Sequence, residues 1–159
     1  MIPYTQHRFS TPSHQSGAAA VEFAIIMFVL FLVGAGMVEF GRAFWYYNAI
    51  AKGTRDAARY LSAIPTANLP AAAATAQDIV VRTAASGGVP GFSAAHVSVA
   101  CAPTACAMAS LPTDINRVTV TAQYGMGIGV LFPFIAPAGG SASGFAVTLV
   151  PHTTMPYLW

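Results

Sequence analysis

The sequence predicts an α+β fold in which a long N-terminal transmembrane helix continues into a small domain with a second helix and a short antiparallel sheet. Three observations predict this fold. Residues 18–38 are apolar except for Glu22, and no proline interrupts the chain from there to Ile64. Farther along, one segment has the start and stop signals of a second helix, and three short segments alternate in the manner of strands.

Composition limits the class of protein. The chain has 159 residues, which leaves room for one small domain beside the helix. Charged residues make up 8% of it, against about 25% in an average soluble protein, and hydrophobic residues make up 55%. This composition is typical of a membrane protein or of a subunit buried in an assembly. The net charge of +2 is too small and too scattered to favour nucleic acid binding.

The apolar run of residues 18–38 is long enough to cross a membrane. At about 1.5 Å per residue, a helix of this length spans the roughly 30 Å hydrocarbon core of a bilayer. The preceding residues 1–17 are polar and have no helical or strand period, so we expect a disordered lead-in. A secretory signal peptide fits poorly, because the apolar run is too long for the core of such a peptide.

Glu22 is the one charged residue in this run. An acid inside a membrane span costs about 2.5–3.5 kcal/mol near the bilayer centre and less near the interface. One interpretation is an acid in the first helical turn, where the helix dipole favours a negative charge. The other is a charge that has a partner. The second is supported by the order of Gly17, four small or apolar residues, Glu22, Phe23 and a hydrophobic helix, which resembles the cleavage site of type IV prepilins.

The residues that follow in the helix point to one family within the prepilin-like proteins. Residues 17–62 are similar to the N-terminal region of TadE-like proteins, which are small pseudopilins of the tight-adherence (Tad) pilus system. The resemblance implies that a prepilin peptidase cuts between Gly17 and Ala18, so that residues 1–17 are a cleaved leader. It also implies that Glu22 pairs with the N-terminal amine of a neighbouring subunit.

Two features depart from the family. The leader carries only one basic side chain, Arg8, whereas family leaders are commonly more basic. Phe23 stands where tyrosine is frequent, which is a mild change because both side chains are planar and aromatic.

Two opposing signals bear on the orientation of the span. Counting positive charges would place the C-terminal side in the cytoplasm, because Arg8 precedes the span and four basic residues follow it, Arg42, Lys52, Arg55 and Arg59. However, long domains translocate regardless of charge, and both cysteines lie in the C-terminal part at disulfide-like spacing. The resemblance also implies an outside C-terminus. We therefore predict a single-pass inner-membrane protein whose domain, residues 63–159, is periplasmic.

The helix is expected to continue beyond the membrane over residues 39–62. Seven residues at alternating spacings of four and three form a stripe along one face: Phe40, Phe44, Tyr47, Ala51, Thr54, Ala58 and Leu61. The stripe could pack only on the chain's own domain. We expect instead that part of it docks the domain and part is free for a partner helix. Aromatic residues 44–47 suit the membrane–water interface.

The rest of the chain predicts a small α+β domain. Residues 62–69 are expected to be a linker, and residues 70–86 a second helix capped by Asn68 and ended by two glycines. A turn follows at residues 89–93. Three strands are predicted, at residues 96–101, 117–124 and 145–150, and they suggest a short antiparallel sheet packed on the long helix.

Cys101 and Cys106 bracket four residues in a predicted loop. The spacing favours a disulfide, and two free buried thiols are the alternative. A redox motif requires two intervening residues. A metal site requires further ligands, and the four histidines share no ligand-like spacing with the cysteines. We therefore expect neither a metal nor a cofactor.

The last quarter of the chain has no charged residue from Val118 to Trp159. Such a surface indicates a buried interface, a contact with the membrane surface, or core. The apolar run 126–140 is broken by Pro133 and Pro137, so it cannot form a regular second span. The tail, residues 152–159, has the aromatic anchors of a contact surface.

Enzymatic functions fit poorly. The glycines from Gly125 to Gly129 lack the third glycine of a dinucleotide-binding loop, and Ser141 lacks the spacing of a nucleophile elbow. The five acids are interpreted as helix caps and solvated side chains: Glu22, Glu39, Asp56, Asp78 and Asp114. We expect no catalysis and no small-molecule substrate.

The resemblance then implies the function. The chain is expected to be a minor pilin or pseudopilin that takes part in assembly of a Tad (Flp-type) pilus, which serves cell adhesion. Its implied partners are the prepilin peptidase, other pilins and pseudopilins, Tad platform proteins and the lipid bilayer. The alternative is an uncleaved single-span scaffold of the Tad machinery. Both leave open whether the chain enters an extracellular pilus or stays in the membrane platform.

Overall fold

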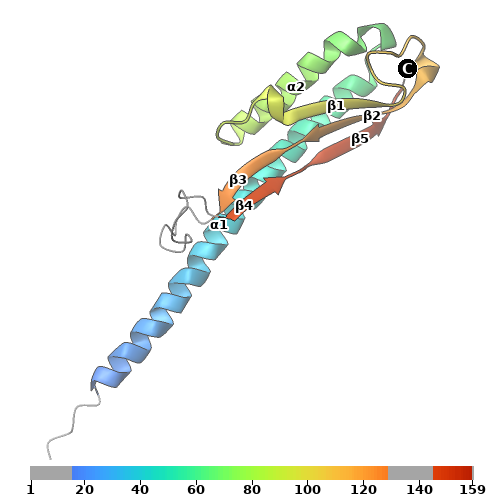
Figure 1. The fold of residues 1–159 in the computed structure, drawn as a ribbon. Coiled ribbons are helices and arrows are strands. Elements are labelled where there is room, and N and C mark those ends of the chain that lie inside the picture. The colour runs from blue at the N-terminus through green and yellow to red at the C-terminus, as the bar shows by residue number, and fades with distance from the viewer. Residues whose placement is uncertain (1–15, 129–144, 159) are drawn as a thin grey trace, which may run out of the picture. The chain divides into compact units, whose positions relative to one another are not determined.

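The structure is a computed structural model that describes residues 16–128 and 145–158 (Figure 1). Its elements are helix α1 (Ser16–Ser62), helix α2 (Leu69–Ser86) and five strands, which are β1 (Val97–Pro103), β2 (Ile115–Ala122), β3 (Tyr124–Ile128), β4 (Phe145–Leu149) and β5 (His152–Pro156). Three short 3-10 turns lie between them. This mixture confirms the predicted α+β fold. The chain divides into two compact units, Met1–Gly36 and Met37–Trp159, whose boundary lies inside α1.

In the first unit, the described part of α1 is apolar around its whole circumference. Large side chains on every face are exposed, among them Val21, Phe23, Phe28 and Val33. A helix that is hydrophobic all round is either enclosed by protein or placed in a membrane. Among residues 16–36, nothing covers this helix, and α1 is long and apolar enough to cross a bilayer.

In the second unit, the C-terminal part of α1 forms the core with α2 and the sheet. Ile50, Ala57 and Leu61 of α1 are fully buried. Helix α2 contributes one apolar face at helical spacing, which consists of Leu69, Ala72, Ala76, Val80 and Ala84. The alanines on this face leave little side-chain volume between the helices, so the two backbones can approach closely.

Helix α2 begins and ends where its sequence signals indicate. Asn68 occupies the N-cap position, although its side chain makes no capping hydrogen bond. At the other end Gly88 has φ 73°, a conformation that glycine adopts without steric cost. The Val89 amide then donates to the Ala84 carbonyl at 3.1 Å, which closes the last turn.

The sheet has the strand order β1-β2-β5, with both pairings antiparallel. Val118, Val120 and Ala122 of β2 point into the core, while alternate residues such as Thr119 lie on the other face. This is the pattern of an antiparallel sheet that packs one face against other elements. Gln77 of α2 ties the helix to β1 by donating to the Val97 carbonyl at 2.9 Å.

Strand β5 was not predicted. Its residues, His152–Pro156, were assigned to an aromatic contact tail, yet they pair along β2 with Val118 opposite Met155. The segment is short and rich in threonine, and Pro156 argues against a strand unless that strand is at an edge, which is where β5 lies. The tail is also held by its own domain, since the Tyr157 hydroxyl donates to the Ile64 carbonyl at 2.6 Å.

The predicted strand at residues 117–124 is divided in the structure. Strand β2 ends at Ala122, and Tyr124 begins β3, which pairs with β4 in a separate two-stranded sheet. The change of partner occurs where the Ala122 amide donates to the Pro151 carbonyl and the Gln123 amide donates to the His96 carbonyl. Most of the apolar run 126–140 lies outside the described residues.

Cys101 and Cys106 form the disulfide that their spacing favours, with sulfur atoms 1.96 Å apart. The bond closes a short loop at the end of β1. No free cysteine occurs in the described part of the chain.

We predict that Gly53→Ala lowers the free energy of unfolding by about 1–3 kcal/mol through overpacking. An added Cβ would lie 3.0 Å from the Val80 Cα and 3.2 Å from the Thr83 Cβ, so α1 and α2 would have to separate. Gly41→Ala in the same helix is the matched control, because its Cβ meets nothing within 4 Å. That variant should gain about 0.5–1 kcal/mol from helix propensity. Denaturant unfolding of the full chain in micelles, followed by circular dichroism, measures both, and equal effects would contradict the close approach.

The loop at Asp114 should respond to acid. Its Oδ2 atom accepts hydrogen bonds from the amides of Leu111 at 2.8 Å and Ser110 at 2.9 Å, which hold the pKa of this carboxyl below its usual 3.8, against a smaller opposing effect of desolvation. A lowered pKa means that the stabilisation is present above the unfolded-state pKa and is lost as pH falls through the folded-state pKa. NMR titration of the Leu111 amide should therefore show a midpoint below 3.8 that Asp114→Asn abolishes. A midpoint at or above that value would contradict the capping role.

Candidate functional site

The predicted processing residues lie in the first turns of α1. The helix begins at Ser16, so the Gly17–Ala18 bond is in its first turn and Glu22 and Phe23 follow one to two turns later. All four side-chain positions are exposed, and a Cβ added at Gly17 would meet nothing within 4 Å. Within the described residues, Glu22 has no ion pair. A partner for its charge would therefore have to come from outside the described residues.

The predicted interface stripe of α1 divides into two parts. Its C-terminal members are buried in the domain: Ala51, Thr54, Ala58 and Leu61. Its N-terminal members are exposed: Phe40, Phe44 and Tyr47. Docking on the domain accounts for the first part. The use of the second part by a partner helix stays a prediction.

The aromatic residues 44–47 have two different environments. Phe44 and Tyr47 are exposed, whereas Trp45, although 66% exposed, and the half-buried Tyr46 join α1 to the domain. The Trp45 indole donates to the Gly87 carbonyl at 2.8 Å, and the Tyr46 ring meets the Tyr124 ring edge-on at 6.4 Å. Phe44, Trp45 and Tyr47 thus keep exposed surface for contacts outside the domain, whereas Tyr46 is half-buried.

The Tyr124 hydroxyl is fixed as a neutral donor. It donates to the Pro90 carbonyl at 2.7 Å. Burial raises the pKa of Tyr124 above 10.0, the neighbouring Tyr46 raises it further, and the positive charge of Arg42 acts in the opposite direction. The hydroxyl therefore keeps its proton at physiological pH, and the hydrogen bond helps to hold β3 on the segment after α2.

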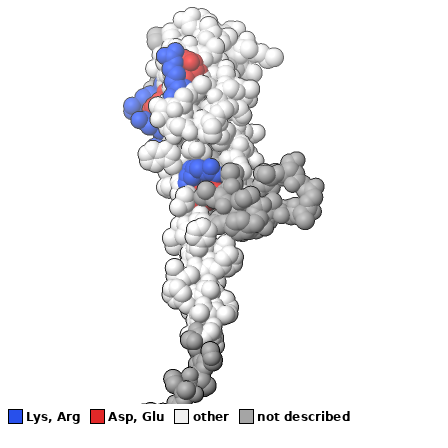
Figure 2. Space-filling view, turned by 90° about the vertical axis from the view of Figure 1, so that its left-hand side faces the viewer, with Lys and Arg blue, Asp and Glu red and all other residues white. Residues whose placement is uncertain are grey.

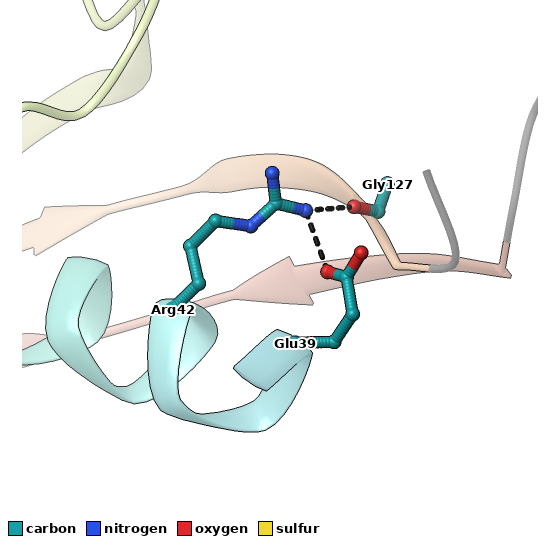
Figure 3. Close-up of polar contacts among 3 residues, drawn as sticks. All are labelled: Glu39, Arg42 and Gly127. Carbon is teal, nitrogen blue, oxygen red and sulfur yellow. Dashed lines mark hydrogen bonds and ion pairs between the residues drawn. The ribbon is translucent and has the colours of Figure 1, made fainter. Parts of the chain in front are cut away.

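A buried acid lies in α1 just after the predicted membrane span (Figure 3). The Glu39 side chain is 2% exposed, and its Oε2 atom accepts a hydrogen bond from Arg42 Nη2 at 2.7 Å. The same nitrogen donates to the Gly127 carbonyl of β3 at 3.1 Å. One guanidinium group thus neutralises the acid and ties the two-stranded sheet to α1.

Sequence reasoning missed this ion pair. It interpreted Glu39 as a cap or a solvated acid, and the burial of the side chain shows that this was wrong. A signal was present, because Glu39 and Arg42 are three residues apart and share one helix face directly after an apolar run. The sequence could not indicate that β3 would cover that face.

The rest of the site carries little charge. On the face that Figure 2 shows, Lys, Arg, Asp and Glu side chains occupy a small part of the described surface, and uncharged side chains form most of it. Among the described residues, no three His, Cys, Asp or Glu side chains gather in a way that could hold a metal ion. The arrangement is one of apolar surface and structural contacts.

We predict that Arg42→Met destabilises the domain more than Arg82→Met does. The first variant leaves the buried Glu39 without its cation, at a cost of about 1–3 kcal/mol. The second removes a partner from the exposed Asp78–Arg82 pair of α2, which is worth less than about 0.5 kcal/mol. Amide hydrogen exchange should also accelerate at residues 125–128 in Arg42→Met alone. Equal unfolding free energies and unchanged exchange would contradict the role of the pair.

Comparison with known proteins yields one match. The model of the TadE-like protein family matches residues 17–59. No curated protein and no solved structure matches the chain. The matched segment is α1 from its first turn nearly to its end, and it includes Glu22, the exposed aromatic residues and the Glu39–Arg42 pair. The match confirms the resemblance drawn from the sequence: residues 17–59 are similar to TadE-like proteins.

Proposed function

We propose that this protein is a minor pilin or pseudopilin that takes part in assembly of a Tad (Flp-type) pilus. The TadE-like match over α1 is the observation that carries the proposal. In it, α1 anchors the chain in the inner membrane as a single span, a prepilin peptidase removes residues 1–17, and the domain is periplasmic. The role is non-enzymatic, and it depends on helix–helix and domain contacts.

The N-terminal unit has the surface that such a role requires. Its large apolar side chains are exposed, so they are available to lipid or to neighbouring helices. Gly34 and Gly36 are open as well, since an added Cβ would meet nothing within 4 Å at either residue. Small residues allow close packing of helices in membranes, where van der Waals contact replaces the hydrophobic driving force.

Glu22 supplies the specificity in this proposal. Cleavage after Gly17 would create a free amine at Ala18, four residues before the acid. The amine of one subunit and the Glu22 carboxylate of its neighbour would neutralise each other in the membrane, where an unpaired charge is costly. Only one register of two neighbouring helices brings the two groups together, so the pair would also set the register of assembly.

The alternative function is an uncleaved single-span scaffold of the Tad machinery. The two functions differ at a single peptide bond, and the exposed first turns of α1 are compatible with both. In the scaffold, Glu22 would act as a helix-start acid favoured by the dipole.

The test is the intact mass and N-terminal sequence of the protein from its native membrane. We expect a chain that begins at Ala18, and Gly17→Phe should leave it uncut. Glu22→Ala should be cut normally yet lose pilus assembly, because the pairing partner is missing. Asp78→Ala, which removes an acid from α2 outside the matched segment, should change neither result.

An intact Met1 terminus in cells with active prepilin peptidase would favour the scaffold. Normal piliation of the Glu22→Ala strain would argue against the pairing role. Electron microscopy of the cell surface, together with quantification of pilus protein in sheared fractions, gives that second readout.

A further inference from the structure

An open apolar groove lies between α1 and the two-stranded sheet. Its volume is about 590 Å³. Side chains from both elements line it: Phe40, Phe44 and Tyr47 from α1, with Ile128, Val147 and Leu149 from β3 and β4. All of them belong to the second unit of the chain.

The groove leaves large apolar groups uncovered. The side chains of Phe40 and Phe44 are 70% and 69% exposed. Full burial of a phenylalanine side chain is worth about 1.5–3 kcal/mol, so two neighbouring uncovered rings are a strong driving force for contact. A contiguous apolar patch of this kind marks a site of interaction.

The geometry of the two-stranded sheet explains why the groove exists. Val147 and Leu149 are two residues apart, so they share the face of β4 that carries the groove, and they pair with Met126 and Tyr124 of β3. These two partners are buried against the domain, whereas Val147 is 36% exposed. The sheet therefore covers α1 on one side and extends the apolar surface of the helix beyond it.

The position of the groove along α1 indicates what it meets. The predicted membrane span ends at Val38, and Phe40 and Phe44 follow in the same helix about 3 and 9 Å farther along its axis. The polar region on each side of a bilayer is about 5–7 Å thick. The bond from Arg42 to the Gly127 carbonyl holds the sheet at this height. The groove thus begins where the hydrocarbon of the bilayer ends.

The chemistry of the groove selects an apolar occupant. Its lining carries no charged side chain, and the Tyr47 hydroxyl is the one polar side-chain group among the lining residues. Its volume is in the range of small-ligand sites, about 300–1,000 Å³. A hydrocarbon chain has no polar group to satisfy, so it matches this lining.

We propose that this groove binds the acyl chain of a bilayer lipid at the membrane surface, so that the β3–β4 side of the domain rests on the bilayer. The inference depends on insertion of α1 in the membrane, which is part of the proposed function, and is independent of the pilus role. A lipid in the groove would cover Phe40, Phe44 and Val147 at once.

Nitroxide labels on single introduced cysteines test the proposal. The full chain, with its native disulfide kept oxidised, is reconstituted in vesicles of phosphatidylethanolamine and phosphatidylglycerol. Val147→Cys places the label in the groove. Thr148→Cys is the matched control, because the next residue of a strand points to the opposite face. Collision rates with oxygen, which concentrates in lipid, and with an aqueous nickel complex then report the surroundings of each label.

We expect the Val147 label to have a several-fold higher ratio of oxygen to nickel collisions than the Thr148 label. The groove lies outside the hydrocarbon core, so a label that nothing covers would collide with the aqueous nickel complex. A low rate of nickel collisions together with a high rate of oxygen collisions therefore requires lipid in the groove. Phe44→Cys places a second label in the groove, at a side chain that is 69% exposed. The same high ratio of oxygen to nickel collisions is expected there. Far-UV circular dichroism and the intact disulfide verify folding of each variant.

Two results would overturn the inference. Nickel collisions as frequent at the Val147 and Phe44 labels as at the Thr148 label would show a groove filled by water. Low collision rates with both reagents would show a groove covered by protein, whether by another part of this chain or by a second copy. A label at Val29→Cys, inside the predicted span, separates this failure from that of the proposed function. If the Val29 label collides frequently with the nickel complex, α1 is not inserted in the membrane. That result would contradict both the lipid-binding groove and the proposed function.

Discussion

Helix α1 has to satisfy two environments with one unbroken run of backbone hydrogen bonds, and the rest of the structure follows from that constraint. A bilayer offers no water to satisfy free amide and carbonyl groups, so a membrane segment must be helical throughout. Because no proline interrupts the chain until Pro65, the same helix continues as the central element of the domain. Its side chains therefore change from apolar all round to apolar on one face. The helices, the sheet and the ion pair are arranged around that change.

The domain covers one face of α1 and leaves another uncovered. Helix α2 approaches through alanines, and the three-stranded sheet packs valines against the same core. Near the start of the second unit, the two-stranded sheet takes over, and Arg42 joins it to the helix while neutralising Glu39. A buried carboxylate is destabilising without a cation, so this guanidinium both neutralises Glu39 and helps to hold β3 on the helix. The exposed aromatic residues lie beside that junction.

The described residues offer other molecules mainly apolar surface. The disulfide closes a short loop, and buried hydroxyls such as that of Thr54 donate to backbone carbonyls within the fold. Two apolar surfaces are exposed: the helix surface of the first unit, and, within the second unit, the groove between α1 and the two-stranded sheet. The TadE-like match covers residues 17–59, which lie in α1, and stops before α2 and the strands.

The sequence by itself determined the elements whose physics is local. The length and composition of residues 18–38 determined an apolar helix, glycines and Asn68 marked the ends of α2, and cysteine spacing favoured the disulfide. The tertiary structure alone decided the features that depend on distant partners. Strand β5 exists because β2 offers an edge to a threonine-rich segment, and the strand predicted at residues 117–124 divides because Pro151 and His96 accept its last amides. Glu39 is buried because β3 covers the helix there, which no pattern within α1 could indicate. Local hydrogen bonding and hydrophobic periodicity depend on residues that are close together in the sequence, so they can be predicted from it. Burial and strand pairing depend on segments that are far apart in the chain.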